Sequence, residues 1–220
     1  MTIDADGQAP AALQASGLEC VRGERRLFDK LNLTVEPGQC LHVAGANGAG
    51  KTSLLRILAG LLLPTSGSVR WRGQEIASAR EEFGSELAFV GHLNGIKEEL
   101  TVLENVCFEA ATRGGDDSEQ AALRALERLG LRPYADRFAR HLSQGQKRRV
   151  ALARLCGTAP ARLWILDEPF NALDTAAIAT LHDIIAEQMA RGGMIVLTVH
   201  QQIELPAATR RLELAESALA

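Results

Sequence analysis

A glycine-rich octapeptide between an apolar run and a helix-forming run constrains this chain more than any other feature. The apolar residues 40–44 are followed by Gly-Ala-Asn-Gly-Ala-Gly-Lys-Thr, and residues 51–59 are rich in helix formers. Gly48 and Gly50 let the backbone approach a bound group without a Cβ in the way. Backbone N–H groups in such a loop, together with a helix N-terminus carrying roughly +0.5 charge, bind phosphate. The context predicts a strand, a phosphate-binding loop and a helix in direct succession.

The same segment carries the side chains that a nucleoside triphosphate and Mg²⁺ require. Lys51 can reach the β- and γ-phosphates, and the hydroxyl of Thr52 can ligate Mg²⁺. The alternative is a chance glycine-rich turn, but such a turn has no reason to be followed by Lys and Thr at the start of a helix. We therefore predict a nucleotide site, with Mg²⁺, formed by Gly45, Ala46, Asn47, Gly48, Ala49, Gly50, Lys51, Thr52 and Ser53.

Length, charge and cysteine usage exclude several other classes of protein. The 220 residues suffice for one sizeable core, with residues 1–12 expected as a disordered lead-in and 13–220 as a single domain. The net charge is −3 with both signs interspersed, so we expect no nucleic-acid partner. The 4 cysteines lack paired spacing, which favours small buried thiols over disulfides or a metal site. Neither a secretory signal nor a run of ~20 apolar residues is present.

Strand patterns surround the glycine-rich loop, and helical patterns follow. Alternating residues at 31–35, the stretch 68–72 after a Pro-Thr-Ser-Gly turn, and the short apolar run at 87–90 predict strands. The stretch 100–157 reads instead as helices, with apolar residues at helical spacing. A helical block between strand-rich segments predicts an inserted helical subdomain, which we place at residues 93–157.

Near-continuous apolar runs at 163–166 and 194–199 predict parallel strands that are covered on both faces. The helical pattern at 175–191 lies between them, so the three segments predict a βαβ unit. The expected fold class is accordingly α/β.

An acidic pair follows the first of these strands directly. In a parallel sheet, ligands bind at the carboxyl edge, so Asp167 and Glu168 are expected near the phosphates. Asp167 can hold the Mg²⁺ shell with Thr52, and Glu168 can orient and deprotonate an attacking water. By itself, an acidic pair after a strand would indicate a helix cap or a solvated turn. Its combination with the phosphate loop favours a catalytic role for the two acids.

Three further motifs, at residues 142–146, at residues 171–174 and at His200, together resemble those of a known family, the ATP-binding-cassette (ABC) ATPases. The run Leu-Ser-Gln-Gly-Gln at 142–146 is similar to the family's Leu-Ser-Gly-Gly-Gln signature, with Gln144 in place of one glycine. Residues 171–174 resemble the family's D-loop, which includes Asp174, and His200 resembles its switch histidine. The resemblance implies a P-loop ABC ATPase core with an antiparallel β subdomain, and catalysis by Lys51, Glu168 and His200. It also implies a head-to-tail dimer in which one copy presents its signature, Ser143, Gln144, Gly145 and Gln146, to ATP bound by the other.

Two positions depart from the general family pattern. His92 stands where the family has a glutamine that senses Mg²⁺ and the membrane partner, and an imidazole can hydrogen-bond a water of the metal shell. Arg22 stands near the position of the adenine-stacking aromatic residue. A guanidinium can stack on a purine, so ATP is expected while GTP stays open. For the basic run Lys147, Arg148 and Arg149, we expect a solvated helix face rather than an anion site.

The segments 91–97, 100–105 and 164–170 resemble one subfamily, the ATP-binding subunit of the cytochrome c maturation (heme exporter) ABC system. This implies integral membrane subunits as partners, contacted through residues 92–97, and a peripheral location at the cytoplasmic face of the bacterial inner membrane. It further implies that ATP hydrolysis releases a heme-loaded chaperone. Two alternatives stay open: the ATP-binding subunit of another small-molecule ABC transporter, and a soluble ABC ATPase acting on ribosomes or chromosomes.

Overall fold

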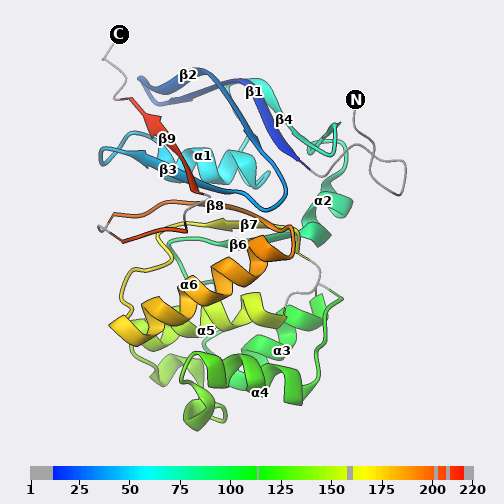
Figure 1. Cartoon of the computed structure of the whole chain (residues 1–220), viewed down its shortest axis with the longest axis vertical. Helices are drawn as coiled ribbons and strands as arrows, with labels where there is room; N and C mark the ends of the chain where they lie inside the picture. The colour runs from blue at the N-terminus through cyan, green and yellow to red at the C-terminus, as the bar shows by residue number, and fades with distance from the viewer. Residues whose placement is uncertain (1–11, 113, 158–160, 201–202, 207–208, 216–220) are drawn as a thin grey trace.

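The chain folds into two β-sheets with one helix between them and a layer of helices on the outer face of the second sheet (Figure 1). This computed structural model describes residues 12–112, 114–157, 161–200, 203–206 and 209–215. Most of the expected lead-in, residues 1–11, lies outside the described residues, whereas Ala12 is buried and its carbonyl accepts a hydrogen bond from the Arg72 N–H.

The first sheet is antiparallel, with strand order β2-β1-β4-β5. Its strands are β1 (Leu13–Arg22), β2 (Arg25–Val35), β4 (Ser66–Trp71) and β5 (Gln74–Glu75). The predicted strands at 31–35 and 68–72 fall within β2 and β4, but β1 and β5 were not predicted. In β1 the alternation is broken by Gly17, beside which the pairing with β2 shifts register. A strict period of two therefore does not run through this strand.

The second sheet is parallel, with strand order β6-β7-β8-β3-β9. Its strands are β3 (Cys40–Gly45), β6 (Leu87–Val90), β7 (Leu163–Leu166), β8 (Met194–Leu197) and β9 (Thr209–Leu214). The predicted strands at 87–90 and 163–166 match β6 and β7. Strand β9 was missed, because its Thr-Arg-Arg-Leu-Glu-Leu sequence lies at the sheet edge and carries charged, exposed side chains. The predicted βαβ unit is confirmed by β7, α6 (Thr175–Ala190) and β8, with β7 and β8 paired in parallel.

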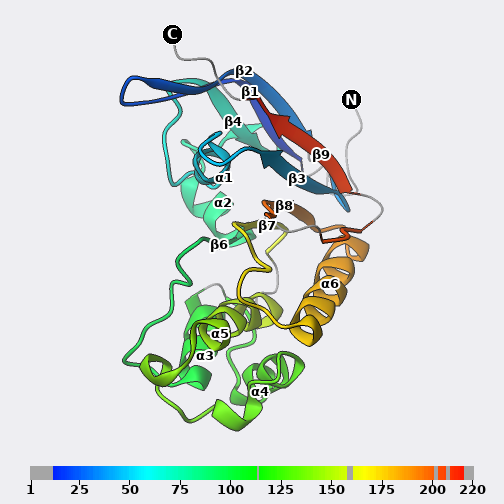
Figure 2. The same ribbon diagram turned by 90° about the vertical axis from the view of Figure 1, so that its left-hand side faces the viewer.

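The remaining helices divide between the two faces of the parallel sheet. Helix α1 (Lys51–Leu58) lies between the two sheets, and the short α2 (Arg80–Glu86) leads into β6. On the other side, α3 (Val102–Thr112), α4 (Glu119–Arg128) and α5 (Gln144–Gly157) form a group beyond α6 (Figure 2). Single 3₁₀ turns occur at Arg132–Tyr134 and Ala139–His141. The α/β prediction is confirmed, while the exact boundary of a helical subdomain at 93–157 stays a prediction.

Alternating side chains of the parallel strands fill two separate cores. In β7, Leu163 and Ile165 pack toward α1 and the antiparallel sheet, whereas Trp164 and Leu166 pack toward the helical group. Burial on both faces explains why this strand reads as a continuous apolar run. The cysteines are free, and Cys20 and Cys40 are buried. Within the described part of the chain, no helix has the length and apolar character needed to cross a bilayer.

Candidate active site

A cavity of about 400 Å³ opens at the carboxyl ends of β3 and β7, beside the N-terminus of α1. It joins the phosphate loop to two predicted residues that are more than a hundred positions away in the sequence. The parallel topology accounts for this, because the loops that follow β3, β7 and β8 leave the sheet at the same edge. The lining residues are Leu27, Asn47, Gly48, Gly50, Lys51, Thr52, Ser53, Glu168 and His200.

The loop around the N-terminus of α1 has the backbone that its glycines predicted. Gly48 and Gly50 have φ angles of 81° and 97°, and a Cβ at Gly50 would lie 2.9 Å from the Cβ of Leu27. Lys51 is buried, and its Nζ donates to the carbonyl oxygens of Gly45 at 2.7 Å and Ala46 at 2.9 Å. The loop carbonyls therefore hold the ammonium group against the phosphate-binding backbone. Ala49, by contrast, is buried in the core between the sheets.

The acid after β7 forms a hydrogen-bonded group with two hydroxyls. Asp167 is 2% exposed; its Oδ2 accepts from Thr52 Oγ1 at 2.9 Å and its Oδ1 from Thr198 Oγ1 at 2.8 Å. Carboxylate and hydroxyl oxygens suit Mg²⁺, which is commonly held by one or two carboxylates plus substrate phosphates. The described residues hold no cluster of three or more His, Cys, Asp or Glu side chains that would form an all-protein metal cage. The donor set therefore fits a Mg²⁺ that is bound together with a nucleotide.

Glu168 is the centre of the second half of the site. Its Oε1 lies 2.7 Å from Nε2 of His200, and its Oε2 accepts from the side-chain amide of Asn171 and lies 4.0 Å from Nδ1 of His92. The backbone is left-handed, with φ of 51°. The Glu168 N–H donates to Thr198 Oγ1 at 2.9 Å. Two other predicted residues, His200 and His92, thus lie beside the carboxylate of Glu168.

A family model supplies the first comparison with known proteins. The model described as ABC transporter matches residues 28–171, from β2 through the acidic pair and Asn171. The chain belongs to the ABC transporter family. ATP binding and hydrolysis by this chain follow from that membership.

Curated relatives narrow the position within the family. A protein of Dechloromonas aromatica named cytochrome c biogenesis ATP-binding export protein CcmA is 53% identical over 199 residues, 90% of this chain and 97% of the relative. The protein of the same name from Methylococcus capsulatus is 50% identical over 204 residues, 93% of this chain and 98% of its own length. The resemblance to the cytochrome c maturation subfamily is therefore confirmed.

Solved structures agree on the fold of the ABC family. A structure described as the ATP-binding subunit of an ABC transporter has a TM-score of 0.77 at 28% identity and covers 86% of this chain and 79% of that one. A putative ABC transporter ATP-binding protein from Pyrococcus furiosus has a TM-score of 0.77 at 24% identity, over 92% of this chain and 97% of that one. The second of these speaks to the fold alone.

Some residues predicted from the family resemblance do not line the cavity of this single chain. Arg22 is exposed at the end of β1, opposite Arg25 in the hairpin. In the signature, the Gln146 N–H donates to Ser143 Oγ at 3.2 Å and the Ser143 N–H to Gln146 Oε1 at 2.9 Å, a capping box that begins α5. Gln144 is exposed beside them. The arrangement leaves the roles of these residues as predictions.

The D-loop residues lie against the signature within the same chain. A Cβ at Gly145 would come within 2.7 Å of the carbonyl oxygen of Ala172, so this glycine permits a close backbone approach. Asp174 caps α6, because its Oδ1 accepts from the Ala177 N–H at 2.9 Å. The signature and the D-loop therefore form one surface at the N-termini of α5 and α6.

The expectation of a solvated basic face on α5 is wrong. Arg148 is buried, 4% exposed, and hydrogen-bonds the turn after β7. Lys147 Nζ pairs with Glu98 Oε1 at 2.5 Å, and Arg149 Nη1 donates to the Leu129 carbonyl at 3.4 Å. The sequence contained no signal for this, because α5 packs against other helices on several sides and its basic positions face protein rather than water.

Two site residues and one contact were missed from sequence. Thr198 is fully buried and bridges Asp167 and Glu168, yet it stands within an apolar strand pattern. Asn171 was predicted as part of the D-loop, but its contact with the Glu168 carboxylate was not, and Leu27 forms one wall of the cavity. A polar residue at the carboxyl end of a buried parallel strand was the signal available for Thr198.

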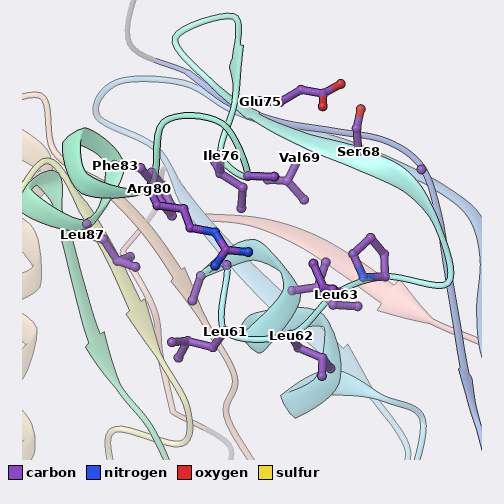
Figure 3. Close-up of a pocket in the computed structure, with 17 residues that line it drawn as sticks. Leu61, Leu62, Leu63, Ser68, Val69, Glu75, Ile76, Arg80, Phe83 and Leu87 are labelled. Atoms are coloured by element: carbon purple, nitrogen blue, oxygen red, sulfur yellow. The ribbon is translucent and has the colours of Figure 1, made fainter.

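A second cavity, of about 490 Å³, lies at the other end of α1 (Figure 3). Its wall is largely apolar, and the side chain of Arg80, the first residue of α2, is one of its polar lining groups. The leucines at its mouth, Leu61 and Leu63, are exposed by 61% and 72%. This cavity faces away from the phosphate loop and takes no part in the nucleotide site. Its apolar lining includes Ile57, Leu61, Leu62, Leu63, Val69, Ile76, Phe83 and Leu87.

Proposed function

We propose that this chain is the ATP-hydrolysing subunit of a bacterial membrane complex for cytochrome c biogenesis. Its ATPase reaction would drive heme export or the release of a heme-loaded chaperone. The relatives that share about half of their residues with this chain over nearly its whole length support this pathway. Their shared name favours it over a transporter for another small molecule, and over a soluble ABC ATPase.

The observation that carries the reaction is the Glu168 carboxylate held 2.7 Å from His200 at the wall of the phosphate-loop cavity. Glu168 is the general base: it accepts a proton from water as the water oxygen forms a bond to the γ-phosphorus. The bond from that phosphorus to the bridging oxygen of ADP breaks, which gives ADP and phosphate. His200 orients the carboxylate and contacts the γ-phosphate.

The phosphate loop binds the triphosphate through its backbone N–H groups and Lys51. Thr52 and Asp167 would hold Mg²⁺, which when bound neutralises charge on the phosphate oxygens. His92, 4.0 Å from the Glu168 carboxylate, is the residue through which the segment 92–97 responds to a membrane partner. We propose that Arg22 stacks on the adenine.

A second copy of the chain completes the site. The capping box of α5 and the adjoining Asp174 present Ser143, Gln144, Gly145 and Gln146 to the nucleotide of the partner copy. Membrane subunits would bind along residues 92–97 and hold the dimer at the cytoplasmic face of the inner membrane. No nucleic acid enters this scheme, in keeping with the interspersed charges of the chain.

Gene deletion tests the pathway in a bacterium that makes c-type cytochromes. The deletion strain is complemented with wild type, with Lys51→Ala, or with Lys30→Ala as a matched surface control. Heme staining of membranes should show c-type cytochromes with wild type and Lys30→Ala and none with Lys51→Ala or the empty vector. Normal cytochromes c in the deletion strain would refute the heme pathway and leave the ATPase assignment intact.

A further inference from the structure

Arg148 places a buried guanidinium at the junction of three segments. Its Nη2 donates to the carbonyl oxygens of Asp167 and Glu168, both at 2.7 Å, and its Nε to the carbonyl oxygen of Pro169 at 3.3 Å. Its Nη1 donates to the carbonyl oxygen of Gly91 at 2.9 Å and to Oδ1 of Asn94 at 3.1 Å. A guanidinium has five N–H donors, so each donor of Arg148 has an acceptor.

These contacts fix the backbone on which Glu168 stands. The carbonyl groups of consecutive residues in the turn after β7 converge on one planar group, which prevents the turn from rotating. Glu168 has a left-handed backbone with φ of 51°, a conformation that non-glycine residues rarely adopt. Arg148 binds the carbonyl of Glu168 and Thr198 Oγ1 accepts from its N–H at 2.9 Å, so both backbone polar groups of Glu168 are held while its carboxylate lies 2.7 Å from Nε2 of His200.

The same guanidinium reaches the segment between β6 and α3. Gly91 and Asn94 lie on either side of His92, the residue 4.0 Å from the Glu168 carboxylate. Arg148 itself belongs to α5, two residues after the signature. One side chain therefore ties the signature helix, the His92 segment and the catalytic turn into a single unit.

We infer that Arg148 is a positioning residue that couples the signature helix and the His92 segment to the Glu168 carboxylate. The inference rests on the proposed role of Glu168 as the base. A movement of the helical group, imposed by a second copy or by a membrane subunit, passes through Arg148 to the catalytic turn. Shorter side chains cannot replace it, since Lys offers three donors from a single point and Gln two.

The electrostatic environment of the Arg148 guanidinium is consistent with a fixed position away from water. Burial lowers the pKa of Arg148, and the charges of Asp167 and Glu168 oppose that shift. The carbonyl dipoles and these acids replace the water that the guanidinium gives up, which a buried cation requires.

The test compares Arg148→Gln with Arg149→Gln. Both remove one positive charge from neighbouring positions of α5, but Arg149 contacts the Leu129 carbonyl and not the turn. In the full-length chain, we expect Arg148→Gln to lower kcat for ATP roughly 30-fold while KM stays within threefold, because misplacement of a catalytic group can slow a reaction up to about 100-fold. Arg149→Gln should keep kcat within twofold. Arg148→Lys replaces Arg148→Gln if the latter does not fold.

Hydrogen exchange of the nucleotide-free chain supplies a readout that does not depend on turnover. Arg148→Gln should speed exchange at the amides of Glu168 and Asn171 and, in the same experiment, at those of residues 91–95. Arg149→Gln should leave both segments unchanged. Equal kcat losses in the two variants, or faster exchange in only one of the two segments, would overturn the coupling. If wild type hydrolyses no ATP, the proposed function fails, and the exchange data still decide the role of Arg148.

Discussion

At the scale of single residues, the site depends on backbone conformations that neighbouring groups must stabilise. Glu168 and Ala172 have φ angles of 51° and 60°, and a left-handed L-residue costs roughly 1–2 kcal/mol. Thr198 and Arg148 bond the N–H and the carbonyl of Glu168, which offsets this cost. Ala172 lies against Gly145, whose lack of a side chain leaves room for the Ala172 carbonyl. The catalytic turn is therefore formed by contacts from distant parts of the chain.

Replacing Thr198 by valine tests the hydroxyl bridge. The variant Thr198→Val keeps the shape but leaves Asp167 Oδ1 and the Glu168 N–H without their partner. We expect the free energy of unfolding in urea to fall by about 1–3 kcal/mol. The control is Thr180→Val, whose hydroxyl donates to the Ala176 carbonyl within its own helix at 3.1 Å. An equal, small effect in both variants would contradict the assigned role of Thr198.

Glu168→Gln tests the base directly. The amide is nearly isosteric with the carboxylate but cannot accept the proton, and general-base catalysis contributes roughly 100- to 10,000-fold. We expect at least a 100-fold loss of phosphate release with ATP affinity within threefold of wild type. The matched control, Glu187→Gln, alters a surface ion pair with Arg128 and should retain activity. A loss of less than tenfold in Glu168→Gln would sink the assignment.

At the scale of elements, helix N-termini carry both structure and the surfaces proposed for function. Ser143 and Gln146 form the capping box of α5, and Asp174 caps α6. Residues needed by the helices themselves thus lie where a second copy would meet the nucleotide. A mutation at these positions therefore changes both the stability of the helix and the proposed contact with a second copy, so the effect on helix stability must be measured separately.

Asp174 permits that separation. Asp174→Ala removes the acceptor of the Ala177 N–H, and we expect a loss of about 1 kcal/mol in stability. Asp174→Asn keeps a good cap, so its melting curve should stay close to that of wild type. Thermal unfolding of both variants decides the matter, and a stable Asp174→Ala protein would show that the cap contributes little.

At the scale of the whole molecule, one parallel sheet separates two cores and brings the site to one edge. The core around α1 supports the phosphate loop, and the core around α5 and α6 supports the catalytic turn and the signature. The signature does not line the cavity of its own chain, which leaves completion of the site to a second copy in the proposed function.

The proposed dimer gives a prediction at this scale. Glu168→Gln with ATP and Mg²⁺ should elute at twice the molecular mass of the same variant without nucleotide, because unhydrolysed ATP stays between the two copies. The double variant Glu168→Gln/Ser143→Arg should stay monomeric, since the added side chain blocks the signature. Light scattering after gel filtration measures the mass. A monomeric Glu168→Gln chain at saturating ATP would speak against the head-to-tail dimer.

Two thiols, the buried Cys40 and the partly buried Cys156, make the stability of the fold depend on pH in the alkaline range. Burial raises the pKa of Cys40 and of Cys156 from 9.0 to about 11. The folded protein keeps these protons between pH 9 and 11 while the unfolded chain loses them. Stability should therefore be fully present below pH 9 and fall as pH rises, by at most about 1.4 kcal/mol per pH unit for each thiol. Urea unfolding at pH 8 and pH 10.5 measures the slope, which Cys40→Ala/Cys156→Ala should flatten.

The parts of the fold that were predictable from sequence are those where the local residue pattern and the side-chain chemistry indicate the same structure. Lys51 and Thr52 follow a strand and begin a helix, and residues 163–166 form a continuous apolar run, so the phosphate loop and the central strands were readable. Strands β9 and β1 were not predicted, because β9 carries charged, exposed side chains at the sheet edge and the alternation of β1 is interrupted. In both cases pairing with neighbours, rather than local pattern, decides the structure.

By itself, then, the sequence determined the α/β class, the phosphate loop and the identity of the acids, because these depend on short spacings and on the chemistry of a few side chains. Only the tertiary structure decided that Arg148 is buried with every donor used, that Thr198 links Asp167 to Glu168, and that Arg22 stays outside the cavity. The physical reason is that hydrogen-bond partners of a buried polar group come from any segment that the fold brings near. The residues next to such a group in the sequence do not show which distant segment will supply its partners.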